Sequence, residues 1–238
     1  MIYRIGNQRL DIPETGTERK VRTPRQVVPY RDMAETCRNL DALCTFIQHK
    51  PKTVVDGIAR SGFWGAVFRN HWPKCKLVLN GENKECVDIL KTHFPDAIVK
   101  NEDIKKWTSP KSDLCFLDFD KFTLRTIGPW VDVLKRCSAT CRYFSFVDGA
   151  CFGFKFGTWK HYGIKRPTDY YDLLDKALNN ITGKHITALS IFSNAASILL
   201  EDTKPREILF LPPTNLLISR GGKIYKQGQS SNKKKRLF

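Results

Sequence analysis

Four acidic residues stand where short apolar runs give way to polar turns, and carboxylates in such places can hold a ligand or accept a proton. They are Asp56, Glu82, Asp103 and Asp118, each at or just after a run predicted to be a strand. In an open α/β sheet the ligand crevice lies beyond the carboxyl ends of the strands, so these side chains should line one rim. The pattern predicts a ligand site rich in carboxylates.

The turn that follows Asp56 contains Gly57, Ser61, Gly62 and Gly65 and leads into an amphipathic segment. Glycine lets the main chain approach a ligand closely, and the first N–H groups of a helix attract an anion or a carboxylate. We therefore expect this turn to hold a nucleoside-type ligand.

Each acid also has a purely structural interpretation, which the sequence leaves open. Asp56 and Asp118 could cap the helices that follow their strands, a role that contributes about 1 kcal/mol. Glu82 and Asp103 could be ordinary acids of surface loops.

The elements that would position these residues alternate in type along the chain. Strands are predicted over residues 52–56, 75–79, 97–99, 113–118 and 143–147, and helices over residues 62–70, 84–93 and 130–138. Strands that alternate with helices of this length indicate βαβ units and a parallel sheet. The prediction is an α/β, Rossmann-like, doubly wound fold with a mostly parallel sheet of about seven strands and helices on both faces.

Further elements flank this core. Apolar residues at helical spacing predict a helix that begins at Asp32 and ends before Pro51. The same spacing predicts helices over residues 170–179 and 186–200. Two late strands are predicted over residues 207–211 and 216–219. Three parts follow: an extended basic arm over residues 1–30, one domain over residues 31–228, and a basic disordered tail over residues 229–238.

Residues 53–147 resemble the class I S-adenosylmethionine-dependent methyltransferases, whose first strand ends in an acid before a glycine-rich turn. The stretches VVDGIARSGFWG and FLDFDKF are most similar to the tRNA guanosine N2-dimethyltransferase family, in which the fourth strand ends in an Asp-Leu-Asp-Pro-Phe motif. The resemblance implies S-adenosylmethionine as the cofactor, nucleic acid as the substrate and methyl transfer as the reaction.

The resemblance also implies a role for each matching residue. Asp56 and the main chain from Gly57 through Ser61 to Gly62 would face the methionine part of the cofactor. Glu82 would accept hydrogen bonds from the ribose hydroxyls, and Asp103, with Ile104 beside it, would accept one from the adenine amine. Asp118 and Asp120 would orient the target amine, and Phe122 would stack on the base.

Departures from the family pattern keep two other hypotheses open. Ile58 and Arg60 stand where glycine is usual, Lys121 where proline is common, and Glu82 lies about one residue beyond the usual place of its acid. The first alternative is a catalytically inactive methyltransferase-like protein that serves as a nucleic-acid-binding or structural subunit. The second is an NAD-dependent oxidoreductase, because several glycines precede a candidate ribose acid, although the G-x-G-x-x-G register is absent.

Forty Lys and Arg against 24 Asp and Glu give a formal charge of +16, which attracts polyanions such as RNA or DNA. Residues 149–166 mix aromatics that can stack on bases with cations that can meet phosphates, and the tail adds a basic run. Residues 149–166 could instead form a hydrophobic loop that covers the sheet. The residues predicted to bind nucleic acid are Lys155, Trp159, Lys160, Lys165, Arg166, Lys233, Lys234, Lys235 and Arg236.

The cysteines and the lengths of the apolar runs indicate which kinds of site and segment to expect. The eight cysteines form no CxxC pair, so we expect reduced thiols and no metal site. No run approaches the roughly 18 apolar residues that a membrane span needs, so neither a span nor a signal peptide is expected. The expected location is cytoplasmic, with the nucleus as an alternative because of the basic tail. The oligomeric state is left open.

Overall fold

The computed structural model describes residues 2–5, 7–11, 30–119, 127–148, 167–192, 195–211, 218–220 and 223–225. Within these ranges the strands form one sheet of eight strands and a smaller sheet of four. In spatial order the larger sheet contains β10 (Leu209–Leu211), β8 (His185–Phe192), β9 (Ala195–Glu201), β7 (Cys141–Asp148), β6 (Ser112–Leu117), β3 (Thr53–Ala59), β4 (Lys76–Gly81) and β5 (Ile98–Lys100).

The larger sheet is mostly parallel. Only β9 is antiparallel to its neighbours β7 and β8, and every other adjacent pair is parallel. The predicted Rossmann-like α/β sheet is therefore confirmed, and its edge strand β10 lies within the late strand predicted over residues 207–211.

The order of the strands places a ligand crevice near the middle of this sheet. From β3 the chain moves outward through β4 to β5, then crosses back to β6 on the other side of β3 and continues to β7. The direction of winding reverses between β3 and β6. At such a reversal the connections after the two strands diverge, which leaves room for a ligand beyond their carboxyl ends.

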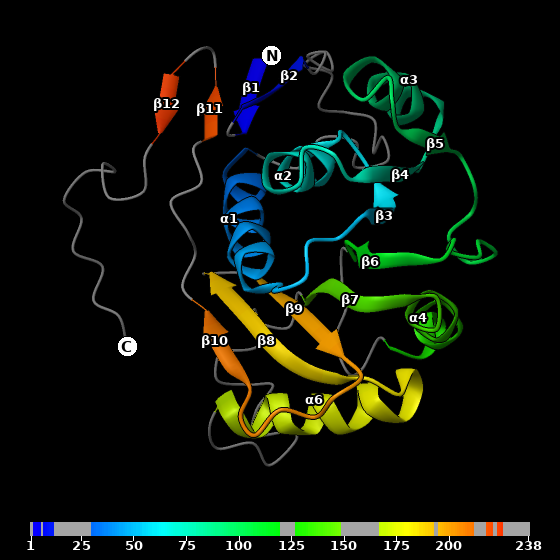
Figure 1. The fold of residues 1–238 in the computed structure, drawn as a ribbon, viewed down its shortest axis with the longest axis vertical. Helices are drawn as coiled ribbons and strands as arrows, with labels where there is room; N and C mark the ends of the chain where they lie inside the picture. The colour runs from blue at the N-terminus through cyan, green and yellow to red at the C-terminus, as the bar shows by residue number, and fades with distance from the viewer. Residues whose placement is uncertain are drawn as a thin grey trace, which may run out of the picture.

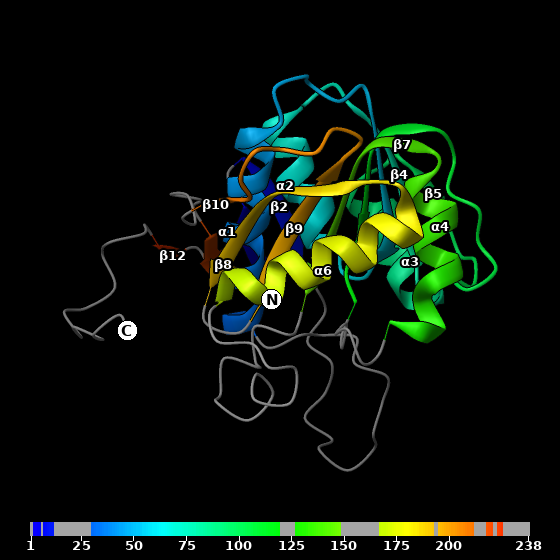
Figure 2. The same cartoon turned by 90° about the horizontal axis from the view of Figure 1, so that it is seen from below.

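Helices cover both faces of the sheet, as predicted. Figure 1 shows α1 (Tyr30–Phe46), α2 (Phe63–His71) and α3 (Lys84–His93) on one side of the sheet, and α4 (Val131–Ser138) and α6 (Pro167–Thr182) on the other. Figure 2 shows α6 lying across the second face. The short 3-10 helix η1 (Gly128–Trp130) leads into α4.

Two hydrophobic cores result, one under each layer of helices. The central strands contribute to both cores because successive side chains point to opposite faces. Val54 and Phe116 pack in the core beneath α1 and α2, whereas their neighbours Val55 and Leu117 pack in the core beneath α4 and α6. The sheet is thus buried on both faces and provides a rigid base for its carboxyl edge.

The helix predicted over residues 186–200 is wrong, because the segment forms β8 and β9 instead. Both strands are covered on both faces. Ala188 and Leu199 pack in one core, while Leu189 and Ile198 pack in the other. A strand buried on both faces lacks the polar–apolar alternation that distinguishes it from a buried helix.

The smaller sheet joins segments from near the two ends of the chain. Its strands, in spatial order, are β12 (Lys223–Tyr225), β11 (Ile218–Arg220), β1 (Ile2–Ile5) and β2 (Gln8–Asp11), and all pairs are antiparallel. Ile5 and Leu10 are buried in the core beneath α1 and α2, and the Asp11 N–H donates to Nε2 of His93 at 3.1 Å.

Within the segment predicted to be an extended arm, residues 2–5 and 8–11 form the strands β1 and β2. The predicted tail over residues 229–238 lies outside the described residues, and the three-part division of the chain stays a prediction.

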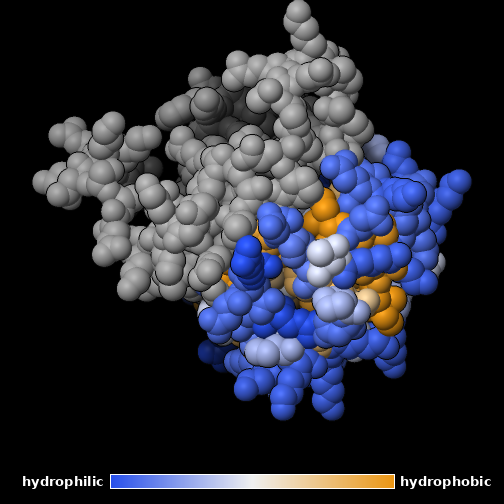
Figure 3. All heavy atoms as spheres, turned by 90° about the horizontal axis from the view of Figure 1, so that it is seen from above, coloured by the Kyte–Doolittle hydropathy of each residue, from blue (hydrophilic) through white to orange (hydrophobic). Residues whose placement is uncertain are grey.

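The described surface is predominantly polar. Only Ile98, Leu173 and Leu209 are large, exposed hydrophobic residues within the described ranges, and Figure 3 shows one face where hydrophilic side chains surround smaller apolar areas. No helix in the described part of the chain is both long enough and apolar enough to cross a membrane.

Candidate functional site

A cavity of about 500 Å³ opens at the carboxyl edge of the larger sheet, beside the point where the winding reverses. Its volume falls within the roughly 300–1,000 Å³ of small-molecule sites. The lining comes from the ends of β3, β4 and β6, from the loop after β5 and from η1: Gly57, Ile58, Arg60, Asn80, Glu82, Asn101, Glu102, Asp103, Ile104, Asp118, Phe119 and Trp130. This cavity is called the edge pocket below.

Three of the four predicted rim acids line the edge pocket. Glu82 follows β4, Asp103 follows β5, and Asp118 follows β6. The side chains of Glu82 and Asp103 are exposed, whereas Asp118 has only 8% of its surface exposed. Parallel strands thus bring these carboxylates together, as the sequence pattern predicted.

Asp56, the fourth acid, does not line the edge pocket. Strand β3 continues past it to Ala59, with a shift of its register against β4 between these two residues. Asp56 is therefore inside the strand and completely buried. Its Oδ1 accepts a hydrogen bond from the Ile58 N–H at 3.2 Å, and its Oδ2 has no hydrogen-bond partner in the described part of the chain.

Burial raises the pKa of Asp56 well above its ordinary value, and the negative charge of Asp118 raises it further. The Ile58 N–H and the positive charge of Arg60 act in the opposite direction but are outweighed by the burial. Loss of hydration disfavours a charged carboxylate in the interior. The neutral form of Asp56 is therefore favoured beneath the pocket.

The glycines of the predicted turn have distinct roles. Gly57 lines the edge pocket, and a Cβ there would overlap the side chains of Leu117 and Trp107. Gly62 precedes α2 with a φ of 81°, in the left-handed region that favours glycine. Ser61 is buried, and neither it nor Gly62 lines the pocket. Only Gly57 of the three gives the main chain direct access to a ligand.

Asn80 connects two sides of the pocket and was missed by the sequence reasoning. Its Nδ2 donates to the carbonyl oxygens of Gly57 at 3.2 Å and Glu102 at 2.9 Å. Its Oδ1 accepts from the Glu102 N–H at 2.9 Å. This buried amide ties the end of β3 to the loop after β5, and nothing in the sequence around Asn80 signals such a long-range role.

The two exposed acids, Glu82 and Asp103, differ in the local hydrogen bonds that they make. Asn83, rather than Glu82, caps α3, because its side chain accepts from the Cys86 N–H at 2.9 Å. Asp103 does organise its own turn, since its Oδ1 accepts from the Lys105 N–H at 3.0 Å. The turn therefore accounts for Asp103 in part, whereas Glu82 has no capping role in α3.

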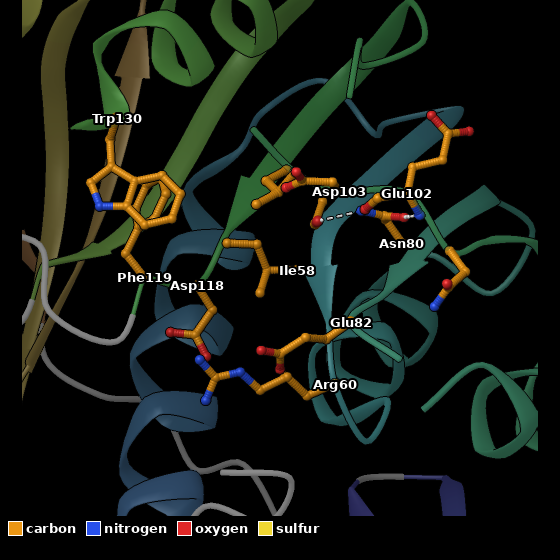
Figure 4. A pocket seen from close by; sticks show the side chains of 12 residues that line it. Ile58, Arg60, Asn80, Glu82, Glu102, Asp103, Asp118, Phe119 and Trp130 are labelled. Atoms are coloured by element: carbon orange, nitrogen blue, oxygen red, sulfur yellow. Dashed lines mark hydrogen bonds between the residues drawn. The ribbon is translucent and has the colours of Figure 1, made fainter. Parts of the chain in front are cut away.

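Aromatic rings form a second wall of the pocket. The rings of Phe119 and Trp130 lie 4.8 Å apart between centroids, and Phe119 also contacts the ring of Phe146 at 6.2 Å. Figure 4 shows Trp130 and Phe119 together on one side of the pocket. The sequence pattern placed Trp130 only at the start of a helix, because its contact with Phe119 depends on the tertiary fold.

Arg60 adds a cation to a pocket that is otherwise acidic. Only 5% of its surface is exposed, and its guanidinium and the Asp118 carboxylate point toward one another in Figure 4. Ile58, which also stands where the resembled family has glycine, lines the same cavity. The two departures from the family pattern therefore shape the pocket itself.

The other predicted site residues lie outside the described residues. They are Asp120, Phe122, Lys155, Trp159, Lys160, Lys165, Arg166, Lys233, Lys234, Lys235 and Arg236. Within the described ranges, no group of three or more His, Cys, Asp or Glu is placed to hold a metal ion.

No protein-family model and no curated protein matches the sequence, but solved structures share its fold. Trm1 from Pyrococcus horikoshii, in complex with S-adenosyl-L-methionine, is 14% identical with a TM-score of 0.58, over 84% of this chain and 61% of that one. The plantazolicin methyltransferase BpumL, in complex with SAH, is 11% identical with a TM-score of 0.52, over 73% and 86%.

An O-methyltransferase family protein from Burkholderia thailandensis is 10% identical with a TM-score of 0.51, over 74% of this chain and 57% of that one. The chain thus spans less than two thirds of the length of the Pyrococcus and Burkholderia structures. Identities this low establish the fold alone. The chain has the α/β fold found in S-adenosylmethionine-dependent methyltransferases.

Proposed function

We propose that this chain, which has the fold of S-adenosylmethionine-dependent methyltransferases, binds S-adenosylmethionine in the edge pocket and methylates a nucleic acid. The observation that carries the proposal is the set of carboxylates from β4, β6 and the loop after β5 around one cavity beside the reversal of winding. Ligands of open α/β sheets bind at this place.

The residues around the edge pocket fit the parts of this cofactor. Glu82 is exposed into the cavity from the end of β4 and offers acceptors for the ribose hydroxyls. Asp103 and Ile104 offer an acceptor and an apolar surface for the adenine. Gly57 lines the cavity without a side chain, so its main chain can lie close to the ligand. Bound here, the cofactor supplies a methyl group activated by its sulfonium.

Asp56, Ser61 and Gly62 would then act indirectly. They shape the segment between β3 and α2, and Gly62 provides the left-handed residue at its end. We assign them to support of the cofactor site rather than to contact with the ligand.

Asp118 is the described residue best placed to handle the methyl acceptor. Its buried carboxylate lies at the carboxyl end of β6, on the pocket wall next to the aromatic pair. A carboxylate in this position can orient an amine and accept its proton, which is the main task of the protein in an in-line displacement. Asp120 and Phe122 complete this group in the proposal.

The distribution of charge supports a polyanionic substrate. Residues outside the described ranges carry 15 Lys and Arg against 3 Asp and Glu, and therefore contribute +12 of the formal charge of +16. The described body has 25 against 21. Attraction to phosphates is thus concentrated in segments that flank or interrupt the described fold, including the residues predicted to bind nucleic acid.

Calorimetric titration with S-adenosylhomocysteine tests cofactor binding. We expect saturable binding, which Glu82→Gln weakens about tenfold because a charged acceptor for the ribose is lost. Glu85→Gln is the matched control, since Glu85 is exposed on α3 and does not line the pocket. No binding at about 1 mM ligand, equivalent to less than about 4 kcal/mol, would contradict the proposal.

Transfer of a labelled methyl group from S-adenosylmethionine to RNA or DNA tests the substrate class. Asp118→Asn should reduce transfer at least about a hundredfold, the usual range for a positioned proton acceptor, while the affinity for nucleic acid is retained. Methylation of small molecules but of neither polymer would contradict the assignment of the substrate.

A non-catalytic nucleic-acid-binding protein is the second candidate, favoured by the side chains of Ile58 and Arg60 in the cavity wall. It predicts nucleic-acid binding without any binding of S-adenosylhomocysteine. Saturable binding of NADH, followed by nicotinamide fluorescence, would instead support the oxidoreductase hypothesis.

A further inference from the structure

Arg60 is the one basic side chain among the described residues that line the edge pocket. The other charged residues of the lining are acidic: Glu82, Glu102, Asp103 and Asp118. A buried guanidinium within an acidic cavity gives the site an electrostatic direction, because a ligand that carries both signs of charge fits in one orientation better than in the reverse.

The charges are separated along the pocket. Arg60 follows β3 by one residue and points toward Asp118, at the end of β6. Glu102 and Asp103 lie in the loop after β5, and Asn80 fixes the main chain of Glu102 there. Figure 4 shows Glu102 on the side of the pocket away from Arg60 and Asp118. The one cation of the described lining is therefore on the β3–β6 side, where Figure 4 also shows the carboxylates of Asp118 and Glu82. On the β5 side the lining contains the carboxylates of Glu102 and Asp103, and Glu102 pairs with Lys100 at 3.8 Å.

We propose that Arg60 binds the carboxylate of the amino-acid end of the ligand, and thereby orients the ligand and selects against analogues that lack this carboxylate. The inference rests on the proposed function, since it assumes that a nucleoside with an amino-acid end occupies the edge pocket. It gives this chain a binding residue at a position where the resembled family has glycine.

Charge determines the orientation. A ligand bound the other way would place its carboxylate beside Asp103, whose like charge repels it, and beside Glu102, which already pairs with Lys100. Among the described residues, no basic side chain lines that side of the pocket. Bound with its amino-acid end toward β3, the ligand meets a guanidinium in a mostly buried place, where water weakens the attraction less than at the surface.

Asp118 does not prevent this contact. A guanidinium has five N–H donors in a planar fork, so Arg60 can face Asp118 and a ligand carboxylate at the same time. Burial also raises the pKa of Asp56, which acts against a further negative charge beneath the pocket.

The test compares ligands that differ only at the amino-acid end. S-adenosylhomocysteine contains the carboxylate, and 5′-methylthioadenosine has the same nucleoside and sulfur without the amino acid. We expect the wild type to bind S-adenosylhomocysteine about ten- to a hundredfold more tightly, the range for a hydrogen bond to a charged group. Arg60→Met should remove most of this preference and leave the affinity for 5′-methylthioadenosine within about twofold.

Two further variants and one further ligand pair sharpen the comparison. Arg60→Lys retains the charge and should keep part of the preference, while Arg206→Met removes an exposed arginine outside the edge pocket and should keep all of it. S-adenosylmethionine against its decarboxylated form separates the carboxylate from the amine. Thermal unfolding of each variant checks that it is folded.

The outcomes separate the inference from the proposed function. Equal wild-type affinity for S-adenosylhomocysteine and 5′-methylthioadenosine overturns the role of Arg60 and leaves cofactor binding intact. If Arg60→Met weakens the binding of both ligands equally, the role of Arg60 is also overturned and cofactor binding is left intact. Failure of the wild type to bind either ligand overturns the proposed function, and the inference with it.

Discussion

Gly57 and Gly62 require glycine for different physical reasons, and alanine substitutions separate those reasons. Gly62 has a φ of 81°, and a Cβ there would also lie 2.8 Å from Phe94, whereas Gly57 lacks room because of Leu117 and Trp107. Left-handed backbone costs about 1–2 kcal/mol for other residues, and overpacking costs about 1–3 kcal/mol. We predict that Gly62→Ala and Gly57→Ala each lower the free energy of unfolding by at least about 1 kcal/mol.

Two other glycines serve as matched controls in the same denaturant titrations. Gly183 has a φ of 72°, but a Cβ there would meet no atom within 4 Å, so Gly183→Ala isolates the backbone effect. Gly128 has neither feature, and Gly128→Ala should change stability by less than about 0.5 kcal/mol. Equal losses at all four positions would refute the separation of causes.

The buried carboxyl of Asp56 should make stability depend on pH. Burial raises its pKa in the folded state above the ordinary value of 3.8. The folded protein then binds the proton more tightly, so the stability that Asp56 contributes is complete below about pH 3.8 and is lost as pH rises through the folded-state pKa. In that window the slope approaches about 1.4 kcal/mol per pH unit.

Asp56→Asn removes this titration and keeps an oxygen that can accept from the Ile58 N–H. We predict that the variant gains stability relative to the wild type as pH rises from 4 to 8, by urea unfolding at each pH. A difference between the two proteins that does not change with pH would contradict a raised pKa for Asp56.

At the scale of elements, Asn80 joins the end of β3 to the loop after β5 by three hydrogen bonds. Asn80→Ala leaves the carbonyl of Gly57 and the main chain of Glu102 without these partners. We predict a loss of about 2–4 kcal/mol of stability, from the cost of unsatisfied buried polar groups, and weaker binding of S-adenosylhomocysteine. Unfolding and calorimetry measure the two effects.

Asn101→Ala is the control for the effect on stability alone, because Asn101 itself lines the edge pocket. Asn101 is exposed, and its Nδ2 makes one hydrogen bond, of 3.1 Å, to the Gly81 carbonyl. Its loss should cost about 1 kcal/mol or less. Equal losses of stability from the two substitutions would show that the hydrogen bonds of Asn80 have no special role in stability.

The helices and strands from β3 to β7 could be predicted because the local spacing of apolar residues distinguishes a helix from a strand there. Strand β3 follows from a short apolar run, and helix α3 follows from apolar residues at helical spacing. Strands β8 and β9 could not, since both their faces are buried and their small residues suit either structure. The extension of β3 to Ala59 depends on a shift in pairing with β4, which local sequence does not encode.

The candidate site, like the fold, could be predicted only in part. Glu82, Asp103 and Asp118 could be placed together because parallel strands share a carboxyl edge. Asn80 and Trp130 could not, because their contacts join segments that are distant in sequence. Their roles arise from tertiary packing rather than from a local motif.

At the scale of the whole molecule, most of the positive charge lies outside the described body, in segments that include the basic run from Lys233 to Arg236. If these four cations contact phosphates of duplex DNA, replacing all four with serine should reduce the slope of log K against log salt by roughly 3 to 4. Fluorescence anisotropy at several salt concentrations measures the slope. An unchanged slope would exclude the tail from the interface.

The small sheet has a consequence for the order of events during synthesis. Tyr3 in β1 pairs with Arg220 in β11, so this pairing must wait until the more than 200 residues between the two strands and β11 itself have left the ribosome. The larger sheet from β3 to β7 can form earlier, because its strands follow one another closely in sequence. Contacts between distant segments close slowly. The pairing of β1 with β11 is therefore expected to be a late step of folding, after the edge pocket has its shape.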